Sequence, residues 1–130
     1  SYKIHQNSVI EDLDALIALS DTLPIAYNRN NYVVVGSRSH MSPETEAFFE
    51  EKKKEHGNVE VMAVGSSLKL CMVAEGKADA YPRYAPTMEW DTGAGHAIAK
   101  FAGFSVKQYN SSDDVVYNKE NLLNPWFLVS

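Results

Sequence analysis

A short polar turn, Gly65-Ser66-Ser67, is followed by Lys69 and lies between two apolar segments of different periodicity. Residues 59–64 have the composition of a strand, and the apolar residues after the turn have helical spacing. Free backbone N–H groups and the positive end of a helix dipole favour an anion at such a turn. A phosphate site is physically reasonable here. The residues lack the spacing of a P-loop, however, and an ordinary helix cap with Lys69 in solvent fits them too.

His40 and Arg83 are two further side chains that could bind a phosphorylated ligand. His40 ends the polar loop 37–40, which follows the β-branched run 32–35, and an imidazole there could bond a phosphate or a base. Arg83 has tyrosines on both sides, and its guanidinium could stack on a base or bind a phosphate through two bonds. A surface histidine and an exposed strand end are the alternative interpretations.

Asp91 is the carboxylate best placed for a metal ion. It falls in the first turn of a predicted helix, where a carboxylate commonly caps free N–H groups. The same group could be one ligand of Mg²⁺, which needs further carboxylates or phosphate oxygens, but no partners stand at a convincing spacing. Cys71 lies on the apolar face of a predicted helix and is interpreted as a core thiol, not a nucleophile.

Strands and helices must alternate to position these residues. A strand over residues 32–35 precedes a helix over residues 43–56, for which Ser42 is the predicted cap and Gly57 the stop. Further strands are predicted over residues 59–64, 79–83, 104–109 and 126–129, and further helices over residues 67–76 and 91–102. This alternation indicates a layered α/β domain whose strand order the sequence does not reveal.

Two side-chain patterns support the helices. Glu50 and Lys54 are spaced to pair four residues apart. An apolar stripe about one helix face wide recurs at intervals of three and four, formed by Trp90, Ala94, Ala97, Ile98 and Phe101.

The first thirty or so residues fit this plan poorly, because they begin in mid-pattern without a cap. They indicate a cut end or, alternatively, an ordinary ragged terminus.

The composition indicates a soluble globular domain. The 130 residues are 45% hydrophobic and 22% charged, which argues against a disordered chain. No run approaches the ~18 apolar residues that span a bilayer, and the first residues lack the features of a signal peptide. A formal net charge of −5 argues against binding to nucleic acid, and a single cysteine fits a reducing compartment. We expect the protein in the cytoplasm or at the inner face of the membrane.

Several runs occur in one order along the chain: Gly65-Ser-Ser-Leu-Lys-Leu-Cys-Met-Val-Ala-Glu-Gly76, Asp79-Ala-Tyr-Pro-Arg83 and Trp90-Asp-Thr-Gly-Ala-Gly-His96. With Ser37-Arg-Ser-His40 before them and Leu123-Asn-Pro125 after them, they resemble the C-terminal half of CysQ-type 3'(2'),5'-bisphosphate nucleotidases. These enzymes belong to the inositol monophosphatase superfamily. The likeness covers roughly residues 32–130.

The resemblance implies a mixed central sheet flanked by helices. It also implies a Mg²⁺-dependent hydrolysis of 3'-phosphoadenosine 5'-phosphate to AMP and phosphate in sulfur assimilation. By the same resemblance, Asp91 matches a metal ligand of the family. The positions that match its contacts to the nucleotide and its phosphates are Ser37, His40, Gly65, Ser66, Lys69 and Arg83.

One departure from the family is large. The motif Asp-Pro-(Ile/Leu)-Asp-Gly-Thr, which supplies metal ligands, and the glutamate that helps to activate water are absent from the sequence. The resemblance therefore assigns residues 1–31 to the tail of an N-terminal half and a connector, and residues 32–130 to a C-terminal α/β domain. We expect no complete catalytic set in this chain, little activity without the partner half, and a phosphorylated nucleotide as ligand. An inositol monophosphatase, a sugar bisphosphatase and a non-catalytic binding module are the alternatives.

Overall fold

The computed structural model describes residues 1–5, 12–36 and 41–130. Its elements in order are β1 (Tyr2–Ile4), α1 (Leu13–Ala18), β2 (Ser20–Thr22), β3 (Tyr32–Gly36), α2 (Pro43–His56), β4 (Val59–Ala63), α3 (Leu68–Glu75), β5 (Tyr81–Arg83), α4 (Glu89–Phe101), β6 (Val106–Gln108) and β7 (Phe127–Val129). The strands and helices predicted from residue 32 onward are all present, and the α/β class is confirmed. None of the described helices has the length and apolar content to cross a membrane.

A mixed sheet forms the centre of the protein. β3 and β4 pair in parallel, whereas β7 lies between β5 and β6 and is antiparallel to both. A parallel bridge between Val34 and Ala80 joins the two groups of strands. The backbone N–H of Val35 donates to the carbonyl of Ala80 at 2.8 Å. The spatial order is therefore β4-β3-β5-β7-β6, which the sequence did not reveal.

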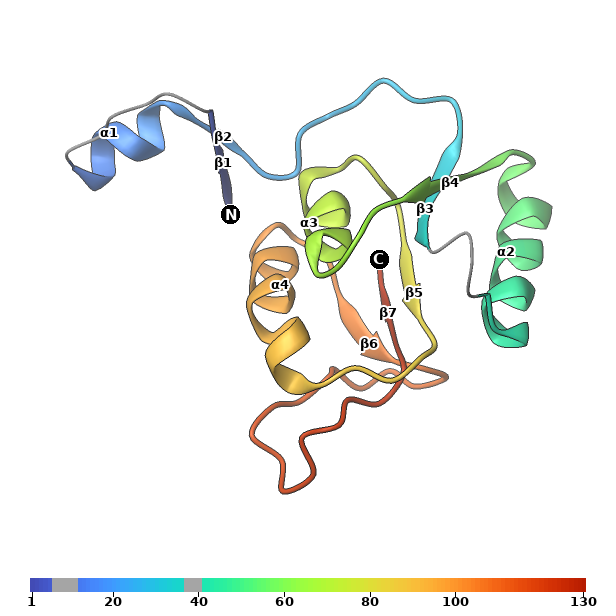
Figure 1. Cartoon of the computed structure of the whole chain (residues 1–130). Helices are drawn as coiled ribbons and strands as arrows, with labels where there is room; N and C mark the ends of the chain where they lie inside the picture. Colours follow the sequence, from blue (N-terminus) through green and yellow to red (C-terminus); the bar gives the residue numbers. More distant parts are fainter. Residues whose placement is uncertain (6–11, 37–40) are drawn as a thin grey trace.

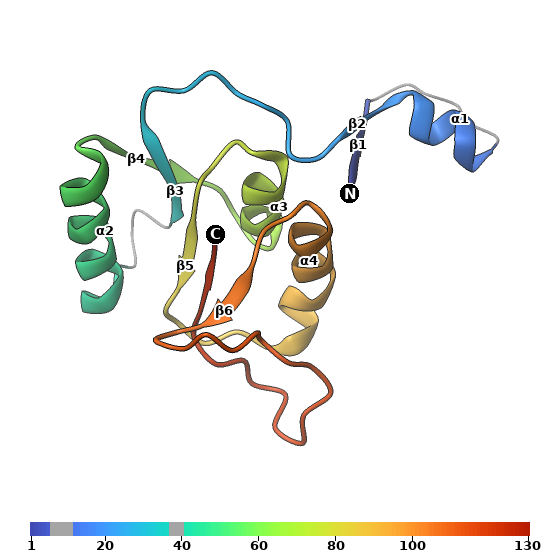
Figure 2. The same cartoon turned by 180° about the vertical axis from the view of Figure 1, so that it is seen from behind.

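Helices cover both faces of this sheet. α2 lies on one side, whereas α3 and α4 lie together on the other (Figures 1 and 2). Side chains alternate along β3, because successive residues of a strand point to opposite faces. Val33 and Val35 belong to the core cluster shared with α3 and α4, and Val34 packs with Phe48 and Phe49 of α2. The continuous run of valines is thus explained by burial on both faces.

The predicted ends of α2 are confirmed, but one predicted ion pair is wrong. The Ser42 hydroxyl caps the N-terminus, and Gly57 follows the last turn at a φ of 75°. Glu50 accepts a hydrogen bond from Lys53 at 2.6 Å and does not pair with Lys54. Residues three apart are neighbours on a helix as well as residues four apart, so spacing alone did not decide the partner.

The α4 helix is confirmed, but the stripe that predicted it is not its buried face. All the residues of the stripe are exposed; the residues that α4 buries are Thr92, Gly95, His96 and Ala99. A Cβ at Gly95 would lie 3.0 Å from the Cβ of Leu70, so the small residue lets α3 and α4 approach closely. Trp90 and Phe101 remain 69% and 77% exposed.

Glu75, the last residue of α3, ties the N-terminal segment to the rest of the protein. Its carboxylate accepts hydrogen bonds from Lys3 and from Tyr27, and it forms an ion pair with Lys77 at 3.0 Å. Burial by itself would raise the pKa of Glu75, but the hydrogen bonds from these three side chains outweigh it and lower the pKa to about 2. The negative charge of Glu75 at this end of α3 is therefore compensated.

Candidate functional site

A cavity of about 430 Å³ opens between the start of α3, strand β5 and the first turn of α4. Four of the residues predicted to bind ligand or metal line it: Ser66, Lys69, Arg83 and Asp91. Gly65 directly precedes Ser66 but is not among the lining residues, and Ser37 and His40 lie outside the described residues. The chain thus brings together side chains from three elements, and their roles as ligands remain predictions.

The turn before α3 leaves its backbone free of side-chain caps. Ser66 has a φ of 54°, in the left-handed region, and Ser67 occupies the cap position without accepting a hydrogen bond through its side chain. A helix normally satisfies its first N–H groups with such a cap. Within the described residues, the start of α3 is therefore suited to an external anion, as the sequence predicted.

Lys69 lies in the first turn of α3 and is partly buried. Its ammonium lies 5.8 Å from the centre of the Tyr81 ring and 3.4 Å from the carbonyl oxygen of Ser66. Burial and the nearby charge of Arg83 lower the pKa of Lys69. Among the described residues no carboxylate forms an ion pair with it. An anion in the cavity would offset both the burial of the Lys69 ammonium and its repulsion by Arg83.

Arg83 is the second cation of the cavity. It donates to the carbonyl of Pro86 at 3.0 Å, and its Nε is buried with no hydrogen-bond partner in the described part of the chain. A buried donor without a partner is costly to the fold. Lys69 and Arg83 also line a second cavity of about 340 Å³, and they therefore form a wall between two compartments.

Asp91 acts as a cap and still offers one oxygen. Its Oδ2 accepts the backbone N–H of Met88 at 2.9 Å, whereas Oδ1 has no hydrogen-bond partner among the described residues. The predicted cap and a metal ligand are therefore compatible. No group of three or more His, Cys, Asp or Glu side chains that could hold a metal occurs in residues 1–5, 12–36 and 41–130. Asp91 would need ligands from elsewhere.

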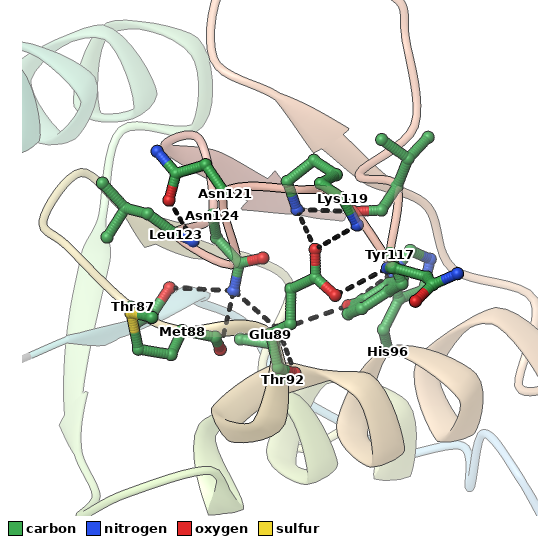
Figure 3. A network of polar contacts seen from close by, with 12 residues as sticks. Thr87, Met88, Glu89, Thr92, His96, Tyr117, Lys119, Asn121, Leu123 and Asn124 are labelled. Atoms are coloured by element: carbon green, nitrogen blue, oxygen red, sulfur yellow. Dashed lines mark hydrogen bonds and ion pairs between the residues drawn. The ribbon is translucent and has the colours of Figure 1, made fainter.

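Sequence reasoning missed a polar network that joins the first turn of α4 to the C-terminal loop (Figure 3). Asn124 is only 4% exposed, and its Nδ2 donates to the carbonyl of Met88 and to Oγ1 of Thr92, each at 2.9 Å. The Tyr117 hydroxyl donates to the same Thr92 oxygen at 3.3 Å. No pattern predicts such contacts, because they join residues about thirty positions apart in the sequence.

A second set of bonds fixes the same loop from the other side. The Glu89 carboxylate accepts the backbone N–H groups of Asn118 at 2.6 Å and Lys119 at 3.2 Å, and it also pairs with the Lys119 ammonium. Hydrogen bonds from Lys119 and these N–H groups lower the pKa of Glu89. The first turn of α4 is therefore held by residues 117–124.

Residues 11–126 match the inositol monophosphatase family. The chain belongs to this family. It is 43% identical to the 3'(2'),5'-bisphosphate nucleotidase CysQ of Escherichia coli over 98 residues, which are 75% of this chain and 38% of that protein. The CysQ of Buchnera aphidicola is 40% identical over 81 residues, 62% of this chain and 29% of that protein. The resemblance to CysQ-type proteins of the inositol monophosphatase family is confirmed.

Solved structures of the family agree with the fold. The crystal structure of CysQ from Bacteroides thetaiotaomicron has a TM-score of 0.83 and 53% identity, covering 97% of this chain and 46% of that one. Inositol monophosphatase II of Staphylococcus aureus has a TM-score of 0.60 at 17% identity, covering 82% of this chain and 38% of that one, and shows the fold alone. The chain spans less than half the length of these relatives.

Proposed function

We propose that this chain forms the nucleotide-binding half of a Mg²⁺-dependent 3'(2'),5'-bisphosphate nucleotidase. The proposed reaction is the hydrolysis of 3'-phosphoadenosine 5'-phosphate to AMP and phosphate, and the name of the Escherichia coli relative, a 3'(2'),5'-bisphosphate nucleotidase, supports this reaction class. The observation that carries the proposal is that Lys69 and Arg83, which have no carboxylate partner among the described residues, line the same cavity as Asp91.

The charges of the cavity suit a bisphosphate. The chain as a whole has a net charge of −5, so attraction of a polyanion depends on local cations. The Lys69 ammonium binds phosphate as a point charge, and the Arg83 guanidinium binds it through two parallel N–H donors. The second cavity on the other side of these cations gives room for the rest of a nucleotide, with Tyr81 and Tyr84 among its lining residues.

Asp91 would hold one Mg²⁺ ion through Oδ1, the oxygen without a hydrogen-bond partner in the described part of the chain. Mg²⁺ prefers oxygen ligands in octahedral geometry, and one carboxylate beside a phosphate site fits that chemistry in part. When bound, the ion supplies charge neutralisation of the phosphate and lowers the pKa of a bound water. Asp91 provides one ligand, and Lys69 and Arg83 orient the phosphate. The remaining ligands belong to the N-terminal half of the proposed protein.

The exposed stripe of α4 is the surface that this other half would cover. Trp90 and Phe101 are 69% and 77% exposed, and Ile98 between them is 37% exposed. An apolar stripe of this kind commonly marks an interface. Trp90 also lines the cavity, so a partner packed on the stripe would reach the edge of the site. Residues 1–31 would connect the two halves.

Phosphate release by the full-length protein tests the proposal. We expect turnover of 3'-phosphoadenosine 5'-phosphate in the presence of Mg²⁺ at a kcat/KM at least tenfold above that for inositol 1-phosphate or fructose 1,6-bisphosphate. The Arg83→Lys variant should raise KM for the nucleotide, since lysine cannot form the paired bonds. A preference for the inositol or sugar phosphate would assign the chain to another branch of the family. No turnover of any of them would favour a binding module.

A further inference from the structure

Asn124 does not line the cavity, yet it is bonded to residues on both sides of Asp91. Its Nδ2 donates to the carbonyl of Met88, three residues before Asp91, and to the hydroxyl of Thr92, the residue after it. These bonds are drawn together in Figure 3, where Asn124 reaches from the C-terminal loop onto the first turn of α4. The side chain is nearly fully buried, so both bonds are shielded from water.

The Met88 backbone connects this amide to the Asp91 carboxylate. The Met88 N–H donates to Asp91 Oδ2 at 2.9 Å, and the Met88 carbonyl accepts the Asp91 N–H at 3.0 Å. Asn124 holds the same carbonyl at 2.9 Å. The N–H and the carbonyl of Met88 belong to adjoining peptide groups, so a shift of the Met88 backbone at the carbonyl would also disturb the bond from its N–H to the Asp91 side chain.

The orientation of the Asn124 amide is fixed by its surroundings. A backbone carbonyl can only accept a hydrogen bond, so the nitrogen of the amide must face Met88. Thr92 Oγ1 can accept the second hydrogen, because it uses its own to donate to the carbonyl of Glu89. The Tyr117 hydroxyl also reaches Thr92, at 3.3 Å, and in turn lies 2.9 Å from Nδ1 of His96.

Backbone bonds hold the same loop independently of the Asn124 side chain. The N–H of Asn124 donates to the carbonyl of Thr87 at 2.8 Å, and the N–H of Glu89 donates to the carbonyl of Leu122 at 3.0 Å. The loop would therefore stay attached without the amide. The added contribution of the amide is the precise placement of Met88 and Thr92, and through them of Asp91.

We propose that Asn124 is a positioning residue that orients the Asp91 carboxylate toward the cavity, with Thr92 as its second anchor. The consequence for catalysis rests on the proposed function, in which Asp91 binds Mg²⁺. Groups that orient a metal ligand typically change metal affinity by about 10- to 100-fold when removed. Asn124 would thus set the Mg²⁺ requirement without touching metal or substrate.

Two measurements on the full-length protein test this inference. The first is the amide hydrogen-exchange rate of Met88, followed by nuclear magnetic resonance, because this N–H is the one bonded to Asp91. Asn124→Leu, which keeps the number and branching of the side-chain heavy atoms and removes the donor, should raise that rate at least tenfold and leave the Val35 amide of the central sheet unchanged. The second is the Mg²⁺ concentration for half-maximal phosphate release, which should rise about tenfold.

Matched variants separate positioning from general destabilisation. Val106→Ala removes buried volume in β6 but no hydrogen bond of the network, and it should lower stability while leaving the Mg²⁺ requirement unchanged. Thr92→Val should raise the requirement more than Thr92→Ser, which keeps the hydroxyl, and this pair carries the test if Asn124→Leu does not fold.

The outcomes distinguish this inference from the proposed function. Unchanged Met88 exchange in Asn124→Leu would overturn the positioning role. Equal Mg²⁺ requirements in the two Thr92 variants would also overturn it, provided that Asp91→Asn does change the Mg²⁺ requirement. If Asp91→Asn leaves the Mg²⁺ requirement unchanged while Met88 exchange responds to Asn124, the metal assignment of Asp91 fails and the orienting role of Asn124 stands.

Discussion

The two ends of helix α3 treat charge in opposite ways. Lys69 near the N-terminus and Glu75 at the C-terminus both oppose the helix dipole, which favours negative charge at the start and positive charge at the end. Glu75 is compensated by Lys3, Tyr27 and Lys77. Lys69 has another cation, Arg83, as its charged neighbour, and its pKa is lowered. Compensated charge at one end stabilises the fold, whereas the charge at the other end, which has no carboxylate partner among the described residues, fits the proposed anion site.

The largest expected effect is on the rate of phosphate release by the 130-residue chain without the proposed N-terminal half. The 130-residue chain alone should release phosphate from 3'-phosphoadenosine 5'-phosphate at least about 10⁴-fold more slowly than the full-length protein, even at saturating Mg²⁺. Asp91 is the one carboxylate that lines the described cavity, and positioning of metal, water and phosphate supplies much of the rate. A phosphate-release assay on the two purified proteins checks this. Comparable rates would show that the chain holds a complete catalytic set.

The second effect separates the two ends directly. Lys69→Met should raise KM for the nucleotide in the full-length protein about 100-fold, because it removes a charge-assisted bond to phosphate. Lys77→Met is the matched control, since it removes the same charge from the compensated end of α3. It should lower stability slightly and leave KM unchanged. Equal effects of the two substitutions on KM would remove the distinction between the ends.

The sequence predicted the elements well, because each carries a local signal. Ser42 and Gly57 mark the ends of α2 through capping preferences, and the valines of β3 mark a strand buried on two faces. The alternation of strands and helices then sufficed for the fold class. The strand order depended on the bridge between Val34 and Ala80, which joins residues far apart in the sequence.

The site was predicted only in part, because local sequence patterns do not report contacts between residues far apart in the sequence. Ser66, Lys69, Arg83 and Asp91 were identified from turn, charge and cap patterns together with the family resemblance, and the fold brings them to one cavity. The hydrogen bonds from Asn124 to the first turn of α4 were missed, since a buried asparagine has no periodic pattern and its partners are about thirty residues away. The exposed stripe of α4 was visible in the sequence, but its periodicity does not say which face the core covers.

The third prediction concerns the compensated end. Glu75→Gln should lower the free energy of unfolding by about 2 kcal/mol at pH 7, because hydrogen bonds to a charged group are lost. The folded-state pKa of Glu75 is about 2, below its ordinary value of 4.5, so its contribution is present above pH 4.5 and is lost as the pH falls toward 2. Urea unfolding of both proteins at pH 7 and pH 3 measures this. A difference that does not shrink at the lower pH would contradict the account.

The smallest expected effect is the pH dependence of nucleotide binding at Lys69, near the N-terminus of α3. The charged form of Lys69 binds the phosphate, and its pKa in the free protein is lowered from 10.5. Affinity should therefore weaken by a few-fold as the pH rises toward that pKa. Lys69→Arg should remove this weakening, because arginine stays protonated. Titrations of the nucleotide between pH 7 and pH 10 would show an identical pH dependence in the two proteins if Lys69 plays no part.

A titration of the isotopically labelled 130-residue chain with adenosine 3',5'-bisphosphate tests the central claim most directly. The account predicts that the amide resonances of Ser66, Ser67 and Lys69 shift in a saturable way and that Lys69→Met abolishes the shifts. It predicts no change at Glu75, where the charge is already compensated. Shifts that centre on Glu75, or shifts at the start of α3 that persist in Lys69→Met, would contradict the assignment of the anion site.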